Sequence, residues 1–553
     1  MSTSAAGTAP SESRTGSAHT YDDAIDALNS LQSNAATIEA LRKSGGRLLD
    51  FAIPEMVEYL ERIGYTTLDL NRLNVIHITG TKGKGSTSAF VDSLLRQLTP
   101  VHSKPKVGLY TSPHMTSVRE RIRINGQPVS HQLFTTYFWQ VWDRLEQNPT
   151  RKFDLTPLRP VYFRFLTLLA FHIFLSEGVQ PVILEVGIGG KYDSTNIVPK
   201  CVVAGITQLG LDHTAILGNT VEEIAVQKAG IFKPQAPAVC WAQQPGKALE
   251  EVDRIANEVG VSDLKIVDVH PALASKAAAL GSEDANTVSL GLPGFHQTTN
   301  ASVALELVNA YLDSEAGKAV FTESSHRAST LTPWQHKGLQ EARWPGRCQT
   351  VPSWRPGLGL TWYLDGAHTT DSLSVCLGWF TAVQQRQAQA KRNKRIFVFN
   401  CTNGRSAHEL LSSVLDAVER GLGGQPGSSS HGTSRYSLAK DYFDQAIFTT
   451  NITFEGGGWS SELTSKLLDD ADLANLTVQN QLAETWKQLV PESSTEVRIT
   501  PSIQAMHNHV LEAAQNQQVD CLVSGSLHLV GGVMAHLQQS GCLDDSLVST
   551  VSP

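Results

Sequence analysis

A glycine-rich segment near the start of the chain carries residues suited to holding a phosphate. Residues 77–87 read HITGTKGKGST. Small residues let backbone N–H groups point at an anion, the N-terminus of a following helix attracts negative charge, and Lys84 adds a mobile cation. Only two residues separate Gly80 from Gly83, where a strict P-loop has four, so the segment predicts a nucleotide site of unusual spacing. A glycine turn without a ligand is the alternative. The candidate nucleotide-binding residues of this loop are Gly80, Thr81, Lys82, Gly83, Lys84, Gly85 and Ser86.

Four further clusters of polar residues follow short apolar runs or lie in loops. They contain Ser112 and Glu120, then Glu185, Asp193 and Asn196, then Asp212 and His213, and finally Lys228. A hydroxyl, a carboxylate and an imidazole near a triphosphate could hold magnesium, although magnesium prefers oxygen ligands and the imidazole is a less usual partner. The alternatives are ordinary: Ser112 caps a turn, Glu185 pairs with a lysine, and His213 is a hydrogen-bonded loop residue.

Apolar runs of strand length must position these residues. Residues 74–80, 106–112, 181–187 and 201–207 are such runs, and segments with helical periodicity, such as 86–98 and 131–145, separate them. Near-continuous apolar strands that alternate with helices are typical of a parallel sheet covered on both faces. Functional groups in such sheets collect at the carboxyl ends of the strands.

A second series of buried strands follows a helix at 296–312 and a polar connector at 313–333. Its members are residues 360–368, 395–402, 445–450 and 519–526. The sequence therefore predicts an α/β protein with a disordered tail at 1–20, a mostly parallel, P-loop ATPase-like domain at 21–333 and a smaller Rossmann-like α/β domain at 334–553. Residues 385–394 and 421–432 look like surface insertions.

Composition narrows the class of protein. The chain has 553 residues, more than one core usually supports, and a formal charge of -8, which argues against a nucleic-acid partner. Since no apolar run reaches the ~18 residues of a membrane span, none is expected. The seven cysteines show no close spacing and suggest reduced thiols. The first 20 residues suit a cytoplasmic protein with a disordered tail. A mitochondrial presequence is the alternative, although such a segment usually has several arginines and few acids, and this one has only Arg14 and carries Glu12.

Eight motifs in order give the sequence a family resemblance. They are TGTKGKGS, YTSPH with ERI, LEVGIGGKYDSTN, LGLDHTAILGNTVEEIAVQKAGI, LPGFHQTTNA, WPGRCQ, YLDGAHTTDS and GSLHLVGG. Together, from about Tyr21 to Gly532, the chain resembles the folylpolyglutamate synthases, which are Mur-ligase-like ATP-dependent amide ligases, and the short glycine loop is that family's own variant. Many bacterial members read DGAHNP where this chain has DGAHTT at 365–370, a form similar to the eukaryotic branch.

The resemblance implies roles for residues of the first domain. Lys84 matches the phosphate-loop lysine, and Ser112, Glu185 and His213 match magnesium ligands. Lys228 matches a lysine that members carry as a carbamate, where it helps to place a second magnesium. The expected catalytic residues are thus Lys84, Lys228 and His213, and a monovalent cation is a further expected cofactor. An unmodified Lys228 in a salt bridge is the alternative.

Two residues further along the chain match ATP contacts by resemblance, and two more are candidates close to the nucleotide. Arg347 of WPGR suits a phosphate, Asp365 of DGAH suits ribose hydroxyls, and Asn300 and His368 are candidates beside the nucleotide. The alternatives are a domain-surface ion pair for Arg347 and a turn acid for Asp365.

The activity implied by the resemblance is the ATP-dependent addition of L-glutamate to the γ-carboxylate of folates and their polyglutamates, through an acyl phosphate, with ADP and phosphate as products. The expected partners are folates, L-glutamate and ATP, without nucleic acid, and the chain is expected to be a monomer. Two alternatives remain open: a dihydrofolate synthase, which uses the same chemistry on dihydropteroate, and a nucleotide-binding relative without activity. The DGAHTT form favours polyglutamylation.

Overall fold

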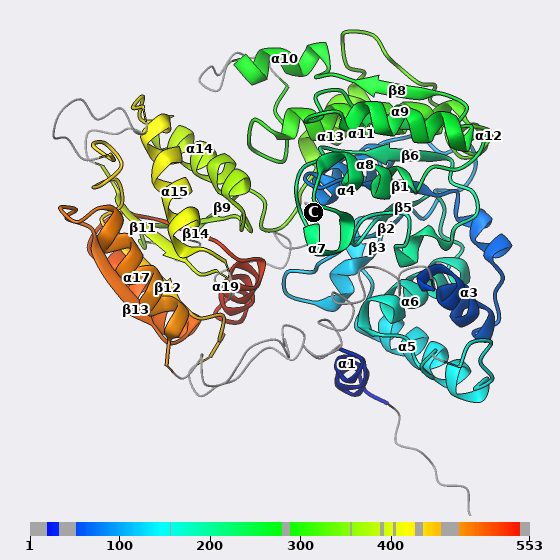
Figure 1. Cartoon of the computed structure of the whole chain (residues 1–553), viewed down its shortest axis with the longest axis horizontal. Coiled ribbons are helices and arrows are strands. Elements are labelled where there is room, and N and C mark those ends of the chain that lie inside the picture. Colours follow the sequence, from blue (N-terminus) through cyan, green and yellow to red (C-terminus); the bar gives the residue numbers. More distant parts are fainter. Residues whose placement is uncertain are drawn as a thin grey trace, which may run out of the picture.

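The computed structural model contains two α/β parts that lie side by side (Figure 1). It describes residues 19–32, 51–154, 156–278, 288–353, 357–386, 392–401, 405–425, 435–454 and 475–541. The larger part contains the elements from Tyr21 to Glu341, and the smaller part contains those from Gln349 to Gln539. Most of the predicted tail at 1–20 and parts of both predicted insertions lie outside the described residues.

The larger part is built on a sheet that has eight strands among the described residues, in the order β4-β3-β2-β5-β1-β6-β7-β8. The pairs from β2 to β8 are parallel, whereas β3 and β4 form an antiparallel edge. The bounds are β1 Ile76–Thr79, β2 Gly108–Tyr110, β3 Ile122–Ile124, β4 Gln127–Pro128, β5 Val182–Glu185, β6 Val203–Ile206, β7 Ala238–Trp241 and β8 Leu264–Val267. This confirms the predicted mostly parallel sheet.

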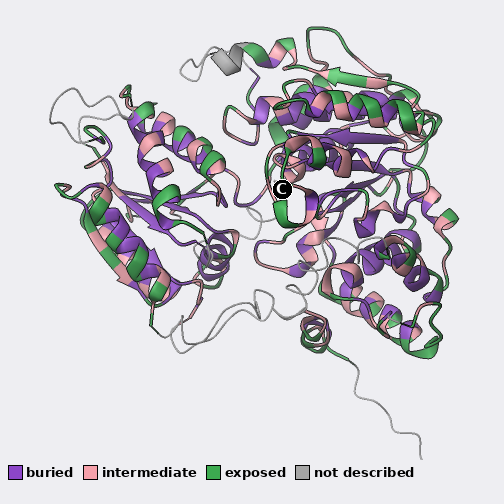
Figure 2. Ribbon diagram, in the orientation of Figure 1, coloured by how far each residue is buried: buried purple, intermediate pink, exposed green. Residues whose placement is uncertain are grey.

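Helices cover both faces of this sheet, so its central strands are buried throughout (Figure 2). Successive residues of β5, Ile183 and Leu184, enter two different hydrophobic cores, which is the period-two alternation of a strand. The helices of the larger part are α1 Tyr21–Ser30, α3 Ala52–Arg62, η2 Thr67–Leu73, α4 Lys84–Leu95, η3 Val118–Arg121, α5 His131–Gln147, α6 Tyr162–Ser176, η4 Ser194–Ile197, α7 Thr214–Leu217, α8 Val221–Ala229, α9 Ala248–Val259, α10 Pro271–Ala278, α11 Gln297–Asp313, α12 Glu315–Val320 and α13 Pro333–Glu341.

The smaller part repeats this plan with a sheet that has six strands among the described residues. Its order is β13-β12-β11-β14-β10-β9, and only the edge strand β9 runs antiparallel to its neighbour. The strands are β9 Gln349–Pro352, β10 Leu360–Leu364, β11 Lys394–Phe399, β12 Gln445–Thr449, β13 Glu496–Thr500 and β14 Val519–Ser524. The helices are α14 Thr370–Arg386, α15 Ala407–Gly421, α17 Thr477–Leu489, α18 Ile503–Ala514 and α19 Leu527–Gln539. The predicted second α/β unit is therefore confirmed.

The segment predicted as a polar connector at 313–333 differs from the prediction. It contains α12, because the Ser314 side chain accepts the N–H of Gly317 at 3.0 Å and caps a short helix. The division at 333/334 stays a prediction; α13 begins there, yet its Leu339 belongs to the same core as Leu94 of α4.

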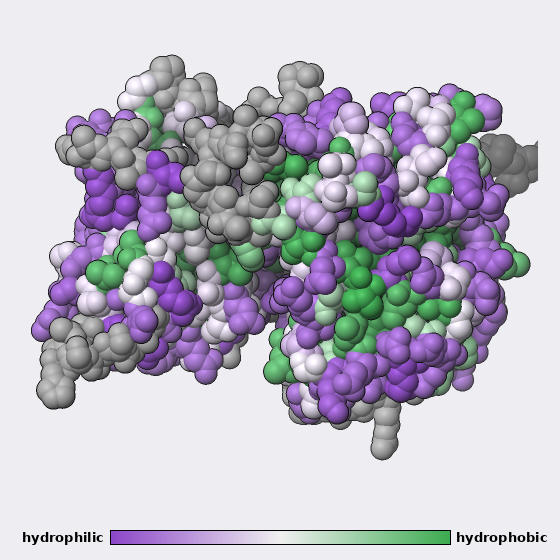
Figure 3. All heavy atoms as spheres, turned by 90° about the horizontal axis from the view of Figure 1, so that it is seen from above, coloured by the Kyte–Doolittle hydropathy of each residue, from purple (hydrophilic) through white to green (hydrophobic). Residues whose placement is uncertain are grey.

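Two general properties bear on the function classes. None of the described helices is both long and apolar enough to cross a lipid bilayer. Hydrophilic residues cover much of the surface seen from above, and hydrophobic residues gather in one region of the larger part (Figure 3).

Free, buried thiols are found at Cys201, Cys240, Cys348, Cys376, Cys401 and Cys521, while Cys542 lies outside the described residues.

Candidate active site

The glycine loop lies at the carboxyl end of β1 and leads directly into α4. Gly83 is the N-cap of α4 and has φ +87°, a left-handed conformation that favours glycine. A Cβ at Gly83 would lie 2.1 Å from Oδ1 of Asn300, so α11 packs against the loop itself. Because Lys84 is the first residue of α4, the loop presents the free backbone N–H groups of a helix N-terminus.

Two lysines converge on the carbonyl oxygen of Gly80. Nζ of Lys84 donates to it at 2.8 Å and lies 3.4 Å from the carbonyl oxygen of Thr81. Nζ of Lys228, from α8, donates to the same Gly80 oxygen at 2.8 Å. Burial, and next the charge of Lys84, lower the pKa of Lys228 to about 6. Lys228 therefore donates to a carbonyl oxygen, and no ion pair joins it to a carboxylate within the described residues.

Glu185 and Ser112 meet at the ends of neighbouring strands. Glu185 ends β5, where it pairs in register with Ile78 of β1, and Ser112 follows β2. The backbone N–H of Ser112 donates to Oε2 of Glu185 at 3.2 Å. Burial raises the pKa of Glu185 to about 7, although Lys84 works in the opposite direction. A buried carboxylate of this kind can accept a cation beside the glycine loop.

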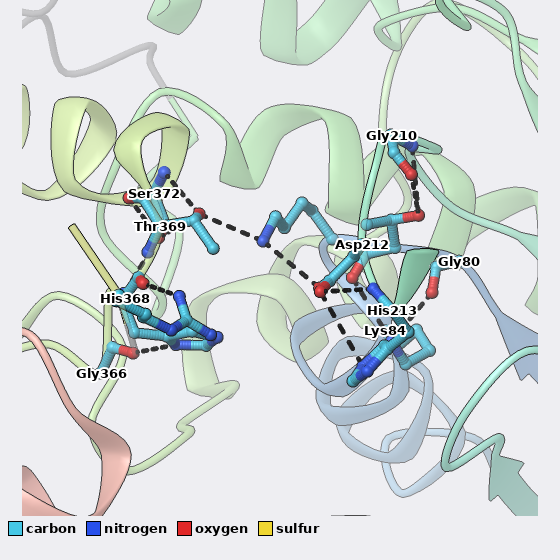
Figure 4. A network of polar contacts seen from close by, with 12 residues as sticks. Gly80, Lys84, Gly210, Asp212, His213, Gly366, His368, Thr369 and Ser372 are labelled. Atoms are coloured by element: carbon cyan, nitrogen blue, oxygen red, sulfur yellow. Dashed lines mark hydrogen bonds and ion pairs between the residues drawn. The ribbon is translucent and has the colours of Figure 1, made fainter. Parts of the chain in front are cut away.

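His213 lies beside Asp212 and close to Lys84 (Figure 4). It is exposed, has φ +51° as the N-cap of α7, and its Nε2 lies 4.0 Å from Oδ1 of Asp212. Partial desolvation of the ring lowers the pKa of His213, and the charge of Asp212 opposes this shift while those of Lys84 and Lys228 add to it. The structure thus places His213 near the two lysines, while the direct contact among the predicted metal ligands is that of Ser112 with Glu185.

Lys82 connects the loop to the smaller domain. Its Nζ lies 3.8 Å from Oδ2 of Asp212 and donates to Oγ1 of Thr369 at 3.3 Å (Figure 4). Arg405 donates to the carbonyl oxygen of His368, the residue before Thr369. These contacts bring the glycine loop and the DGAH turn face to face.

The DGAH turn arranges the candidates of the smaller domain. Oδ2 of Asp365 accepts the N–H of Cys348 at 2.7 Å, and Oδ1 accepts that of Ala367 at 2.9 Å. The carboxylate therefore ties the DGAH turn to the segment that carries Arg347. A Cβ at Gly366 would lie 2.8 Å from Nη1 of Arg347, which places the guanidinium against this turn. Nδ1 of His368 lies 2.9 Å from the Gly366 carbonyl oxygen.

Two other polar residues that follow β5, Asp193 and Asn196, form hydrogen bonds with the backbone. Asp193 accepts the N–H groups of Gly187 and Ile188, both at 3.1 Å, and so shapes the loop after Glu185. Asn196 donates to the Lys191 carbonyl oxygen at 3.0 Å.

A small pocket of about 30 Å³ lies between the two domains and contains residues that the sequence analysis missed. Arg123 is buried within it, with its guanidinium 5.1 Å from the Trp344 ring. No spacing rule singles out either residue, since their contact depends on the tertiary fold. The pocket is lined by Gly85, Thr111, Ser112, Pro113, Met115, Glu120, Arg123, Glu185, Trp344, Pro345, Arg347 and Leu527.

The arrangement suits an anionic substrate with a metal that completes its coordination from that substrate. Among the described residues, no group of three or more His, Cys, Asp or Glu side chains could hold a metal alone. Magnesium typically uses one or two carboxylates together with phosphate oxygens, so a site of Glu185 and Ser112 next to a phosphate loop fits that ion.

Curated proteins of similar sequence share a name. The chain is 41% identical over 530 residues to the folylpolyglutamate synthase of Candida albicans, covering 94% of this chain and 96% of that one. It is 40% identical over 533 residues to the folylpolyglutamate synthase of Neurospora crassa, covering 95% and 93%. No protein-family model matches the sequence.

Solved structures share the fold at lower identity. E. coli FolC in complex with DHPP and ADP has a TM-score of 0.60 at 20% identity and covers 95% of this chain and 99% of its own. Mycobacterium tuberculosis folylpolyglutamate synthase complexed with ADP and AMPPCP has a TM-score of 0.58 at 22% identity and covers 89% and 98%. Both confirm the two-domain α/β architecture.

Proposed function

The chain belongs to the folylpolyglutamate synthase family, and from this premise we propose that it is an ATP-dependent ligase that adds L-glutamate to the γ-carboxylate of folates and their polyglutamates. The observation that carries the proposal is the identity of about 40% with two such synthases over more than nine tenths of the chain. The convergence of Lys84, Lys228 and Glu185 beside the glycine loop supports it.

The glycine loop would hold the phosphates of ATP. Its left-handed Gly83 and the N-terminus of α4 offer backbone N–H groups, and Lys84 needs only to release the Gly80 and Thr81 carbonyl groups to reach an anion. Arg347, on the opposing turn, would add a second cation, with Asn300 and His368 beside the nucleotide. Asp365 already accepts two backbone N–H groups, so we propose that it holds the turn and offers its remaining lone pairs to ribose hydroxyls.

Magnesium would lie against Glu185, and Ser112 and His213 would be its further protein ligands. The fit rests on a carboxylate that is only 4% exposed and accepts one N–H among the contacts described above. When bound, Mg²⁺ neutralises charge on the phosphates and on the carboxylate that meets them.

Lys228 would carry a carbamate. Its side chain is 3% exposed, and a pKa of about 6 leaves its amine mostly neutral near pH 7. A neutral amine can attack CO₂: a nitrogen–carbon bond forms, one proton passes from nitrogen to water, and the product is an anion. That anion, close to Lys84, would supply oxygen ligands for a second magnesium and cancel a positive charge at the loop.

The ligation then follows from charge and position. Lys84 and Arg347 would stabilise the negative charge of the γ-phosphoryl group as it moves to the folate carboxylate, and the amine of glutamate would attack the acyl phosphate. No covalent enzyme nucleophile is needed. The contact of Lys82 with Thr369 supports a closed arrangement of the domains, which would keep water from the acyl phosphate.

The decisive experiment incubates the purified protein with tetrahydrofolate, Mg-ATP and labelled glutamate and separates products by chain length. The proposal expects lengthened γ-glutamyl tails and one ADP for each glutamate added. Product formation with dihydropteroate alone indicates a dihydrofolate synthase. ADP binding without glutamate-dependent phosphate release indicates a relative without ligase activity.

We also propose that the enzyme works as a monomer in the cytoplasm, with mitochondria as the alternative compartment. Both statements rest on the sequence.

A further inference from the structure

The segment of residues 112–117, which we call the Ser112 loop, connects β2 to η3 and carries the predicted magnesium ligand. Its first residue touches Glu185 through the backbone N–H of Ser112 at 3.2 Å. Its position therefore decides where the hydroxyl of Ser112 lies relative to that carboxylate.

One buried carboxylate holds residues 115–117 of the Ser112 loop together. Glu120, which is 5% exposed, accepts the N–H of Met115 at 2.9 Å, the N–H and hydroxyl of Thr116 at 2.9 and 2.7 Å, and the N–H of Ser117 at 2.8 Å. Four hydrogen bonds to one charged group hold consecutive residues together. Met115 therefore moves together with Thr116 and Ser117, and only two residues, 113 and 114, separate it from Ser112.

Met115 is anchored in the other domain. Its side chain is 7% exposed and belongs to the hydrophobic core between the smaller sheet and helices α18 and α19. A Cβ at Gly346 would lie 2.4 Å from Cε of Met115, and a Cβ at Gly531 of α19 would lie 2.1 Å from its carbonyl oxygen. Two glycines of the smaller domain thus leave the space that this loop fills, on the side where α19 faces the larger part (Figure 1).

We propose that Met115 is a positioning residue that couples the placement of the smaller domain to the Ser112–Glu185 pair. The loop is covalently part of the larger domain, while Met115 packs as part of the smaller one, so a shift of the smaller domain that keeps the Met115 contact pulls on the short segment that ends at Ser112. The inference rests on the proposed function, because it assumes that magnesium and nucleotide bind beside Glu185. Closure of the smaller domain would then complete the metal site.

The test measures ADP affinity by calorimetry in EDTA and in saturating Mg²⁺, and takes the ratio of the two dissociation constants. This ratio reports the metal site without turnover. Met115→Ala should lower the Mg²⁺-dependent gain in affinity by about tenfold, within the usual range of coupling between sites, whereas Met115→Leu should keep it within about twofold. Affinity in EDTA should change little in either variant.

Neighbouring glycines of α19 provide a matched control. Gly531→Ala drives a Cβ against the Met115 backbone and should lower the ratio, whereas Gly532→Ala meets Cδ1 of Ile503 at 2.4 Å within the smaller domain and should leave it unchanged. Both substitutions make the same chemical change on the same helix. If Met115→Ala does not fold, this pair decides the matter.

Each outcome has one meaning. A wild-type ratio in Gly531→Ala, or in folded Met115→Ala, overturns the positioning role, as does an equal loss in Gly532→Ala. A wild-type protein whose ADP affinity ignores Mg²⁺ overturns it too. Failure of the wild-type protein to bind ADP under either condition instead contradicts the proposed function.

Discussion

Lys84 and Lys228 both lie with their Nζ atoms 2.8 Å from the carbonyl oxygen of Gly80. Lys84 comes from α4, which follows the glycine loop, and Lys228 comes from α8, so the amines of two different helices meet at one acceptor. Burial disfavours the charged form of Lys228, and the neighbouring charge of Lys84 disfavours it further, so the pKa of Lys228 falls to about 6. Lys228 is therefore suited to act as a neutral nucleophile toward CO₂. Burial lowers the pKa of Lys84 as well, but the charge of Glu185 works in the opposite direction there.

Replacement of Lys84 tests the phosphate loop. Lys84→Ala should reduce glutamate-dependent ADP formation by at least about 100-fold, because a charged donor to the phosphates is lost in a site screened from water. Folding should persist, since the side chain contacts only loop carbonyl groups in the described structure. The control is Lys152→Ala, which removes an exposed lysine paired with Glu61. Near-wild-type turnover in Lys84→Ala contradicts the assignment.

Carbamylation of Lys228 can be detected by NMR spectroscopy. Protein equilibrated with ¹³C-bicarbonate near pH 8 should show a carbamate carbonyl resonance by NMR that Lys228→Met lacks, because the amine is neutral above its pKa of about 6. Lys233→Met is the control, as that lysine donates instead to the Asn196 carbonyl oxygen. A resonance that survives in Lys228→Met, or none in the wild type, rules the carbamate out.

The shape of the glycine loop gives a prediction with a closely matched control. Gly83→Ala should weaken ADP binding by at least about tenfold, because the left-handed φ of +87° disfavours alanine and the new Cβ would meet Asn300 at 2.1 Å. Gly64→Ala has a similar φ of +93° but nothing within 4 Å, so it should show the strain alone and leave ADP affinity unchanged. Equal losses of affinity in both variants would mean that the Asn300 contact is irrelevant.

Sequence patterns predicted the elements whose burial is nearly complete. The runs that became β1, β2, β5 and β6 are apolar on both faces, and each ends at polar residues, so the edge where Ser112, Glu185 and the glycine loop meet could be inferred before any coordinates. Short edge strands such as β4 and β9 have too few residues to show a clear alternation of apolar and polar side chains, and the sequence did not predict them.

Contacts between distant segments could not be predicted in this way. The insertion of Met115 beside Gly531 depends on how the two domains dock. Likewise, Asp365 accepts the N–H of Cys348, and the DGAH motif alone does not predict this partner. Motif spacing identifies chemical groups, but the partners of those groups come from tertiary packing.

The protonation of Glu185 should control metal binding. Burial raises its pKa to about 7, so the carboxylate is mostly protonated below that pH and ionised above it. Because a proton and Mg²⁺ compete for the same oxygen atoms, the Mg²⁺-dependent gain in ADP affinity should rise with pH through about 7, by at most about tenfold per pH unit for one proton. Raising the Mg²⁺ concentration should move this midpoint to lower pH. Calorimetric titrations with ADP between about pH 5.5 and 8.5, with and without Mg²⁺, measure the effect.

Two variants separate Glu185 from other titrating groups. Glu185→Gln cannot ionise, so its Mg²⁺-dependent gain should be small at every pH and without slope. Glu177→Gln is the control, because hydrogen bonds from Lys106 and Tyr137 hold the pKa of Glu177 below its ordinary value and it stays ionised over this range. Its profile should match that of the wild type. A wild-type slope in Glu185→Gln would assign the titration to another residue and remove Glu185 from the metal site.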